Sequence, residues 1–333
     1  MTSRDLSRRT ALSGLAATLA SPAISVTVPA MERVADTARG FDQLHGLIVQ
    51  KDGIRLVEEH LRGPALDRPA NVKSVSKTIV AALLGVAIDR QVVPGLQATI
   101  GDVAPQLIPA SADARAADIT LEDLVTLRAG LERTSGPNYG EWVSSSNWVA
   151  DALSRPFLTD PGARMLYSTG STHILGAVLA EATDQSLLTL ARDWLGAPLA
   201  IEIPAWTRDP QGYYLGGNEM ALSPEAMIRF AEMFAAKGTW NDTQVISEAY
   251  TADALVARTF SPFSGLSYGL GWFLGRSDGA RVALARGYGG QVIAIVPDRG
   301  LAIAITSDPT RPARSGGYFG DLLGLIDQIV QTA

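Results

Sequence analysis

The spacing of apolar residues changes twice along the chain. Near the N-terminal end, two apolar runs within residues 44–60 flank Lys51-Asp52-Gly53, a pattern that predicts a β-hairpin. Four more short apolar runs lie between residues 268 and 307, at 268–275, 280–287, 290–297 and 300–307. Glycine, proline or aspartate separates these runs, as is typical of strands. Strands are therefore expected at both ends of the chain.

The middle of the chain has the pattern of helices. Residues 74–89 are apolar on nearly every face, which predicts a buried helix. A second helix is predicted over 119–131, with Thr120 as cap and Gly130 as stop, and a third begins at the Ser223 cap and ends at Gly238. Further helices are expected at 147–156, 172–199 and 316–331.

This order of elements predicts an α/β (α+β) fold with two lobes. A largely antiparallel sheet built from both chain ends, with flanking helices, would form one lobe, comprising residues 31–73 and 239–333. A mostly helical middle lobe would comprise residues 74–238. Ligands tend to bind between such lobes, so the two are expected to form one catalytic domain.

The first thirty residues differ from the rest and indicate an export signal. Arg4, Arg8 and Arg9 precede a weakly hydrophobic stretch, residues 11–20, and then small residues. "SRRTAL" resembles a twin-arginine signal, whose partner is the twin-arginine export machinery. We expect a periplasmic or secreted protein, cleaved after Ala23 or Ala30, without a stable membrane anchor afterwards; the alternative is an amphipathic N-terminal helix.

Composition narrows the class of function. The net charge is −6 and there is no basic run, which argues against a nucleic-acid partner. The 333 residues include no cysteine, which excludes disulfides, thiolate catalysis and cysteine-ligated zinc. His45, His60 and His173 form no metal-binding pair, and no nucleotide-binding motif is present, so we expect neither metal nor cofactor. His173 is interpreted as structural.

Ser74 and Lys77 form the first candidate for catalysis. Residues three apart are neighbours on a helix, and Ser74 would lie where free N–H groups favour a developing negative charge. Burial of Lys77 would lower the pKa of its amine, and a neutral amine beside a hydroxyl can activate a serine. Alternatively, Ser74 caps the helix and Lys77 reaches solvent. The pair alone does not decide between these interpretations.

Two later segments give the pair a context. Tyr167-Ser168-Thr169 follows a Pro-Gly turn and leads into a helix, and Ala285-Arg286-Gly287 opens a glycine-rich stretch. With Ser74-Val75-Ser76-Lys77, these resemble the S-x-x-K, Y-x-N/Y-S-x and K-T-G or H-x-G motifs of serine hydrolases of the β-lactamase and penicillin-binding-protein superfamily. "ITLEDLVTLRAGL", "LGAPLAI" and "GYGGQ" add to the resemblance over residues 40–330, which is greatest to class C β-lactamases and to related esterases and 6-aminohexanoate-dimer hydrolases.

The resemblance implies roles for these residues. Ser74 is the nucleophile, and Lys77 and Tyr167 share the proton transfers; which of them takes the first proton stays open. The oxyanion hole is formed by the backbone N–H groups of Ser74 and Tyr288, with Gly287 allowing the strand to approach the substrate. Ala285 and Arg286 replace the family's Lys and Thr, which weakens the case for β-lactam hydrolysis.

Several residues are candidates for substrate binding. Thr169 stands where the family usually has an asparagine that holds the substrate amide, and Arg286 could pair with a substrate carboxylate or be solvated. Tyr139 or Trp142 could line the substrate cavity or anchor their loop. The G-x-S-x-G match at Ser267 is discounted, because a strand follows it rather than a helix.

These observations predict an exported serine hydrolase that cleaves small esters or amides through an acyl-enzyme on Ser74. Within enzymes, the alternative is a β-lactamase or a D-Ala-D-Ala carboxypeptidase. An alternative of another class is a non-catalytic binding or sensor protein with the same fold.

Overall fold

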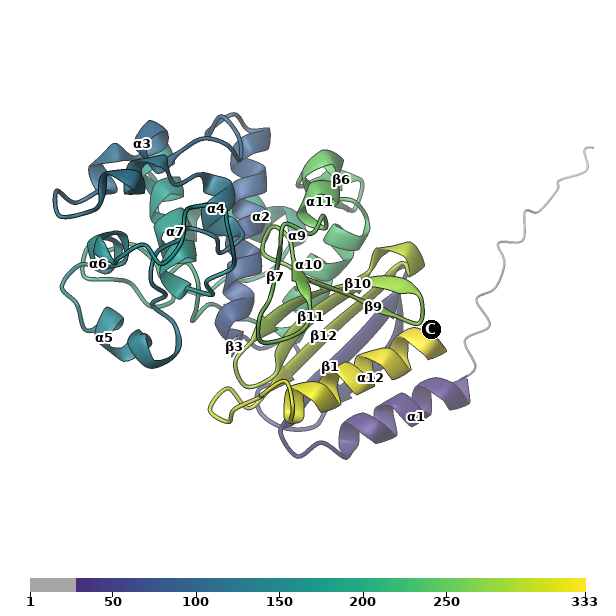
Figure 1. Ribbon diagram of the computed structural model, residues 1–333. Coiled ribbons are helices and arrows are strands. Elements are labelled where there is room, and N and C mark those ends of the chain that lie inside the picture. Colours follow the sequence, from purple (N-terminus) through teal and green to yellow (C-terminus); the bar gives the residue numbers. More distant parts are fainter. Residues whose placement is uncertain (1–27) are drawn as a thin grey trace, which may run out of the picture.

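A large antiparallel sheet forms one half of the molecule (Figure 1). The computed structural model describes residues 28–333. Eight strands follow the order β2-β1-β12-β11-β10-β9-β8-β7, and every neighbouring pair is antiparallel. Their bounds are β1 (Leu44–Lys51), β2 (Ile54–His60), β7 (Thr259–Phe260), β8 (Ser267–Tyr268), β9 (Phe273–Ser277), β10 (Ala280–Gly287), β11 (Gln291–Val296) and β12 (Leu301–Ser307). The prediction of a sheet built from both chain ends is confirmed.

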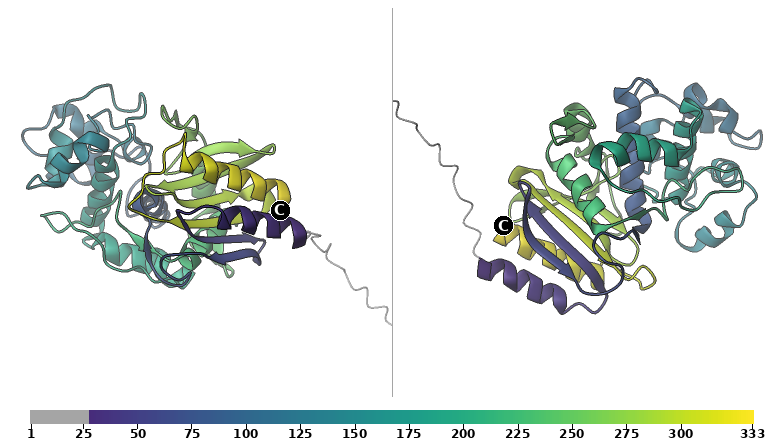
Figure 2. Two further views of the ribbon diagram at one scale, coloured as in Figure 1. Left: turned by 90° about the horizontal axis from the view of Figure 1, so that it is seen from below. Right: turned by 180° about the vertical axis from the view of Figure 1, so that it is seen from behind.

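Helices cover both faces of this sheet. α1 (Val28–Arg39) and α12 (Tyr318–Thr332) lie side by side on one face, as both views in Figure 2 show. α10 (Pro224–Ala235) packs on the other face, against β1, β11 and β12. All residues of β11 and β12 are therefore buried, which explains why these strands are continuous apolar runs without alternation.

The other half is mostly helical. It contains α3 (Ile100–Val103), α4 (Leu121–Val125), α5 (Tyr139–Val143), α6 (Trp148–Ser154), α7 (Thr169–Thr183), α8 (Leu187–Ala191) and α9 (Ala197–Leu199), with a π-helical stretch, Arg192–Gly196, between the last two. α2 (Ser76–Asp89) stands between this half and the sheet and is buried on every side from Ser76 to Ala87 (Figure 1). One hydrophobic core continues from the helical half through α2 to α10 and the sheet.

Small elements complete the chain: α11 (Glu248–Ala254), the paired strands β3 (Ala70–Asn71) and β4 (Ala221–Leu222), and the hairpin of β5 (Thr239–Trp240) and β6 (Thr243–Gln244). Within residues 28–333 no single helix is long and apolar enough to cross a membrane; only the pair Thr169–Thr183 and Leu187–Leu199, bent by 88°, passes by length and composition.

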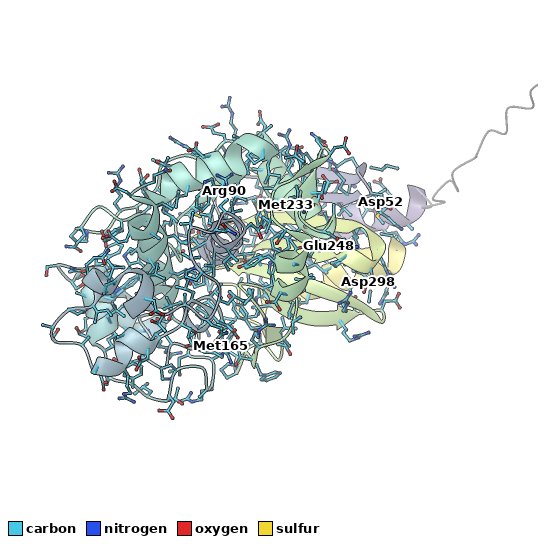
Figure 3. All side chains as sticks on the ribbon, turned by 90° about the horizontal axis from the view of Figure 1, so that it is seen from above. Asp52, Arg90, Met165, Met233, Glu248 and Asp298 are labelled. Atoms are coloured by element: carbon cyan, nitrogen blue, oxygen red, sulfur yellow. The ribbon has the colours of Figure 1, made fainter. Side chains whose placement is uncertain are left out.

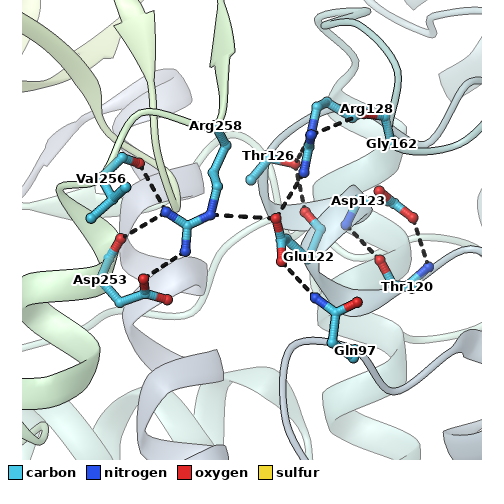
Figure 4. Close-up of polar contacts among 10 residues, drawn as sticks. All are labelled: Gln97, Thr120, Glu122, Asp123, Thr126, Arg128, Gly162, Asp253, Val256 and Arg258. Carbon is cyan, nitrogen blue, oxygen red and sulfur yellow. Dashed lines mark hydrogen bonds and ion pairs between the residues drawn. The ribbon is translucent and has the colours of Figure 1, made fainter.

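A largely buried polar network joins the two halves (Figure 4). Glu122 of α4 accepts from Arg128 at 2.8 Å and contacts Arg258, just before β7, at 3.3 Å. Arg258 also pairs with Asp253 of α11 at 2.6 Å. Because one carboxylate contacts an arginine from each half, this network fixes how α4 sits against the edge of the sheet.

The two ends of the sheet have different surroundings. Asp52 in the β1–β2 turn donates its N–H to Gly300 in the β11–β12 turn, which also holds Asp298; Figure 3 shows both aspartates at the end away from the helical half. The β10–β11 turn lies at the opposite end, where β10 contacts the start of α2. Ser74 therefore lies at this second end of the sheet.

Several predicted boundaries are wrong, for identifiable reasons. The helix expected over 119–131 is only α4, because Leu127 adopts a left-handed φ of 61° and turns into the core on the α12 side of the sheet. The helix expected to end at Gly238 ends at Ala235, and the strand expected over 268–275 is interrupted, leaving β8 and β9. α1 and α11 were not predicted.

The predicted division at residue 238 would place α10 in the helical lobe, but α10 covers the sheet. The expected export signal lies largely outside the described residues. Its last three positions, residues 28–30, form the start of α1.

Candidate active site

Ser74 lies in a short 3₁₀ turn, Lys73–Val75, that leads directly into α2. Lys73, just before it, has a left-handed φ of 51°, an uncommon conformation for a residue with a side chain. The Asn71 side chain accepts the Lys73 N–H at 2.9 Å, and the Ser76 hydroxyl donates to the Lys73 carbonyl at 2.6 Å. The turn is thus held from both sides, with Ser74 at the N-terminus of a 14-residue helix.

Lys77 is 3% exposed, and its amine lies beside the Ser74 hydroxyl. Nζ is 3.2 Å from Ser74 Oγ, 3.3 Å from Thr169 Oγ1 and 2.6 Å from the Gly217 carbonyl oxygen. No carboxylate pairs with it among the described residues. Burial therefore lowers the pKa of Lys77 to about 7. Near neutral pH a large share of the protein has an uncharged amine at this position.

Tyr167 comes from the segment that precedes α7 and stands next to the same amine. Lys77 Nζ is 5.0 Å from the centre of its ring, and the ring packs between Phe263 and Phe273. Burial raises the pKa of Tyr167, while a hydrogen bond with Ser74 and the charge of Arg286 partly oppose this effect. The phenol is therefore uncharged near neutral pH.

The strand β10 contributes the third predicted motif. A Cβ on Gly287 would lie 2.3 Å from the carbonyl oxygen of Val72, so only glycine allows this close approach to the turn that carries Ser74. The next residue, Tyr288, is 52% exposed. Ala285, which stands where the resembling motif has a lysine, is fully buried in the apolar core.

Arg286 has unusual surroundings. Its guanidinium lies 3.4 Å from the centre of the Phe319 ring and 5.1 Å from that of Phe273. Burial lowers the pKa of Arg286 to about 10. Its buried Nη1 has no hydrogen-bond partner among the described residues. A buried guanidinium nitrogen without a partner is a costly arrangement unless a ligand completes it.

These residues surround one cavity of about 570 Å³. Ser74, Tyr167, Thr169, Arg286, Gly287 and Tyr288 line it, as do Tyr139, Phe263 and Phe319. The sequence-predicted residues are thus brought together between the sheet and the helical half. The cavity combines an aromatic wall with a serine hydroxyl and a guanidinium.

Of the two loop aromatic residues considered for the cavity wall, Tyr139 lines the cavity and Trp142 does not. Trp142 is fully buried and does not line the cavity; it donates to the Trp148 carbonyl at 2.8 Å and packs beneath Tyr139. Thr169 lines the cavity, but its hydroxyl already contacts Lys77 and the Ser135 hydroxyl. Ser267 of the discounted G-x-S-x-G match lies in β8, paired with Leu274, with no helix after it.

The sequence did not predict the contacts of the segment Gly217-Asn218-Glu219, whose residues bind Lys77, Tyr139 and Lys73. The Gly217 carbonyl accepts from Lys77, and Asn218 donates to the Tyr139 hydroxyl at 3.1 Å. Glu219, also in a left-handed conformation with φ 69°, pairs with Lys73 at 2.9 Å. The glycines of "LGGN" indicated only a loop, because a main-chain carbonyl has no signature in sequence.

Comparison with known proteins agrees with this geometry. A family model for beta-lactamases matches residues 47–323, well over half of the chain. The chain belongs to the beta-lactamase family. It is a serine hydrolase of the β-lactamase and penicillin-binding-protein superfamily, as the motifs at Ser74, Tyr167 and Gly287 predicted. A search of curated proteins finds no match.

Solved structures with the same fold include several hydrolases. The hydrolase EstCE1, with promiscuous acyltransferase activity, has 17% identity, a TM-score of 0.75 and coverage of 91% of this chain and 100% of that one. A family VIII carboxylesterase has 16% identity, a TM-score of 0.71 and coverage of 92% and 98%. A protein described as a 6-aminohexanoate-dimer hydrolase from Bacillus anthracis has 17% identity, a TM-score of 0.74 and coverage of 90% and 81%. At identities of 16–17%, these similarities show that the proteins share a fold.

Proposed function

We propose that this protein cleaves small esters or amides through an acyl-enzyme on Ser74. The observation that carries the proposal is the buried Lys77 amine, 3.2 Å from the Oγ of Ser74, which lines the same cavity as Tyr167. The esterase and amide hydrolase among the structural neighbours support the same reaction class.

Lys77 is the proposed first base. The Gly217 carbonyl can only accept, so it takes one N–H of Lys77. A neutral amine then has its lone pair available for the Ser74 O–H, and its pKa of about 7 suits proton transfer near neutral pH. Tyr167, with its raised pKa, is unsuited to begin as phenolate.

The proposed reaction has two halves. Ser74 Oγ attacks the carbonyl carbon while Lys77 takes the hydroxyl proton, and the backbone N–H groups of Ser74 and Tyr288 receive the developing oxyanion. Tyr167 gives its proton to the leaving oxygen or nitrogen and regains one from Lys77. Water then attacks the acyl-enzyme with the proton transfers reversed, which releases the acid and restores Ser74.

We further propose that the preferred substrates have an anionic group. Within residues 28–333, the Nη1 of Arg286 has no hydrogen-bond partner, and the exposed Arg133 lines the same cavity. A carboxylate on the acyl part would satisfy the buried guanidinium, since a hydrogen bond to a charged group contributes about 1.5–3 kcal/mol.

A substrate panel tests both parts of the proposal. Purified protein would be assayed on p-nitrophenyl butyrate, on the mono-p-nitrophenyl ester of glutaric acid, on linear amides and on nitrocefin. We expect turnover of the esters, with Arg286→Met lowering the preference for the glutarate ester about tenfold or more. Arg281→Met is the matched control, because this exposed arginine of the same strand, β10, pairs with Asp298 and does not line the cavity. Rapid nitrocefin turnover with inert esters would favour the β-lactamase alternative, and labelling without any turnover would favour a sensor.

For location, we propose export by the twin-arginine route. The motivating observation is "SRRTAL" with the small residues up to Ala30. Fractionation of cells expressing the full chain, with Arg8→Lys/Arg9→Lys as control, would test it. Retention of the unaltered chain in the cytoplasm would contradict the proposal.

A further inference from the structure

His173 lies on α7, one turn beyond Thr169, and is completely buried. The indole rings of Trp142 from α5 and Trp148 from α6 each meet its ring at 5.7 Å, and Leu215 belongs to the same apolar cluster. Asp209 is the charged group that contacts it, with Nε2 and Oδ2 3.1 Å apart and both side chains fully buried. The proposed reaction does not use this pair.

The hydrogen bonds around Asp209 fix the tautomer of the histidine. Asp209 Oδ1 accepts from the N–H groups of Gln211 and Tyr213, at 2.9 and 2.8 Å. The other oxygen, Oδ2, therefore needs a donor, and His173 Nε2–H is the group that faces it. Nδ1 is left as an acceptor, and the N–H of Gly216 points to it at 3.4 Å.

Gly216 and the next residue connect this pair to the catalytic amine. A Cβ on Gly216 would lie 2.3 Å from the Thr172 carbonyl oxygen, so the loop backbone packs directly on α7. A Cβ on Gly217 would lie 2.9 Å from the Thr169 carbonyl oxygen and 3.3 Å from Lys77 Nζ. The Gly217 carbonyl is the nearest acceptor of Lys77, at 2.6 Å.

We propose that His173 is a positioning residue: by accepting the Gly216 N–H, it holds the Gly216-Gly217 main chain where the Gly217 carbonyl receives the Lys77 amine. This inference rests on the proposed function. The segments on either side have other anchors, since Leu215 bonds to Thr207 and Met220 bonds to Ser76. For Gly216-Gly217, which lies between these anchored segments, the contact from a side chain of α7 is the hydrogen bond from the Gly216 N–H to His173.

Two substitutions of His173 separate its two hydrogen bonds. An asparagine places its amide oxygen near the position of Nδ1, so His173→Asn keeps the acceptor for Gly216 and loses the contact with Asp209. A glutamine reaches the position of Nε2, so His173→Gln keeps the contact with Asp209 and loses the acceptor for Gly216. Asp209→Asn provides a third test, because an amide donor opposite Nε2 would favour the Nδ1–H tautomer, which cannot accept from Gly216.

The test measures kcat, KM and the pH profile of kcat/KM for p-nitrophenyl butyrate, with active protein counted by fluorophosphonate titration. In His173→Gln and Asp209→Asn we expect kcat about 10- to 100-fold lower with little change in KM, because a small displacement of a catalytic group has effects of this size. The acid limb of the profile should move to lower pH by about one unit. Loss of the Gly217 carbonyl as acceptor removes more hydrogen-bond stabilisation from the charged form of Lys77 than from the neutral amine, which lowers the pKa of Lys77. In His173→Asn, kcat should stay within about threefold of the unaltered protein and the limb should not move.

Controls keep the outcome interpretable. Ile174→Val, in the adjacent core position of α7, should lower the melting temperature without moving the acid limb. The other titratable groups near Lys77 or in the cavity are unchanged in every variant: Lys73, Arg133, Tyr139, Tyr167, Glu219, Arg286 and Tyr288. Equal effects of asparagine and glutamine, or a loss of kcat with an unmoved limb in His173→Gln and Asp209→Asn, would overturn the inference. Hydrolysis that persists in Ser74→Ala would instead overturn the proposed function.

Discussion

Lys77→Met removes the buried amine and keeps an unbranched side chain of similar length. The pKa of Lys77 falls from 10.5 to about 7 on folding, so between these values the unfolded chain binds a proton that the folded protein does not. The stability of the unaltered protein should therefore rise with pH in this window. At 1.36 kcal/mol per pKa unit, the amine costs about 4 kcal/mol of stability at pH 7 and about 2 kcal/mol at pH 9.

Urea unfolding at pH 7, 8 and 9 measures this effect. We expect the advantage of Lys77→Met over the unaltered protein to shrink by about 2 kcal/mol from pH 7 to pH 9, while esterase activity is lost at every pH. Lys237→Met is the matched control: this lysine is 72% exposed and paired with Glu248, which raises its pKa out of the window. If the difference in free energy of unfolding between Lys77→Met and the unaltered protein does not change with pH, the reasoning is refuted. Lys77 in the folded protein would then be charged over the whole range from pH 7 to pH 9.

Three other substitutions have distinct expected outcomes. Tyr167→Phe should lower kcat/KM about 10²- to 10⁴-fold on alkyl esters but much less on p-nitrophenyl esters, whose leaving group needs no proton; equal losses on both would contradict a role in leaving-group protonation. Gly287→Ala should abolish ester hydrolysis, because its Cβ would lie 2.3 Å from the Val72 carbonyl oxygen; wild-type rates would show that this contact can relax. Thr120→Ala should lower the free energy of unfolding by about 1 kcal/mol through loss of the capping box with Asp123, with kcat unchanged; a change in kcat would show that α4 influences the site.

The sequence predicted that Ser74 and Lys77 are neighbours, because residues three apart lie on one face of a helix, and the family resemblance added Tyr167. The structure brings these three residues together. The antiparallel sheet was also predictable, since apolar runs separated by glycine and proline mark its strands. The ends of helices were less predictable from the sequence. Thr126 was expected to continue a helix, but Leu127 turns into a different core, and this tertiary contact overrides the local pattern.

The contacts of Lys77 show a second limit. Its shortest hydrogen bond goes to the main chain of Gly217, and any residue type provides such a carbonyl. The link through Gly216 to His173 is equally invisible in sequence, since it depends on a close approach of two backbones. Trp142 was a candidate either for the cavity wall or for anchoring its loop, and it packs against His173. Side-chain motifs predict which residues react, and the fold decides which main-chain groups orient them.

Mapping the site of covalent labelling tests the central claim most directly. The unaltered protein and Ser74→Ala would be treated with a fluorophosphonate, digested and examined by mass spectrometry, with Ser267→Ala as control. We predict one adduct on the peptide that contains Ser74 in the unaltered protein and in Ser267→Ala, and neither adduct nor p-nitrophenyl ester hydrolysis in Ser74→Ala. Labelling at another residue, or full hydrolysis by Ser74→Ala, would contradict the assignment of Ser74 as the nucleophile.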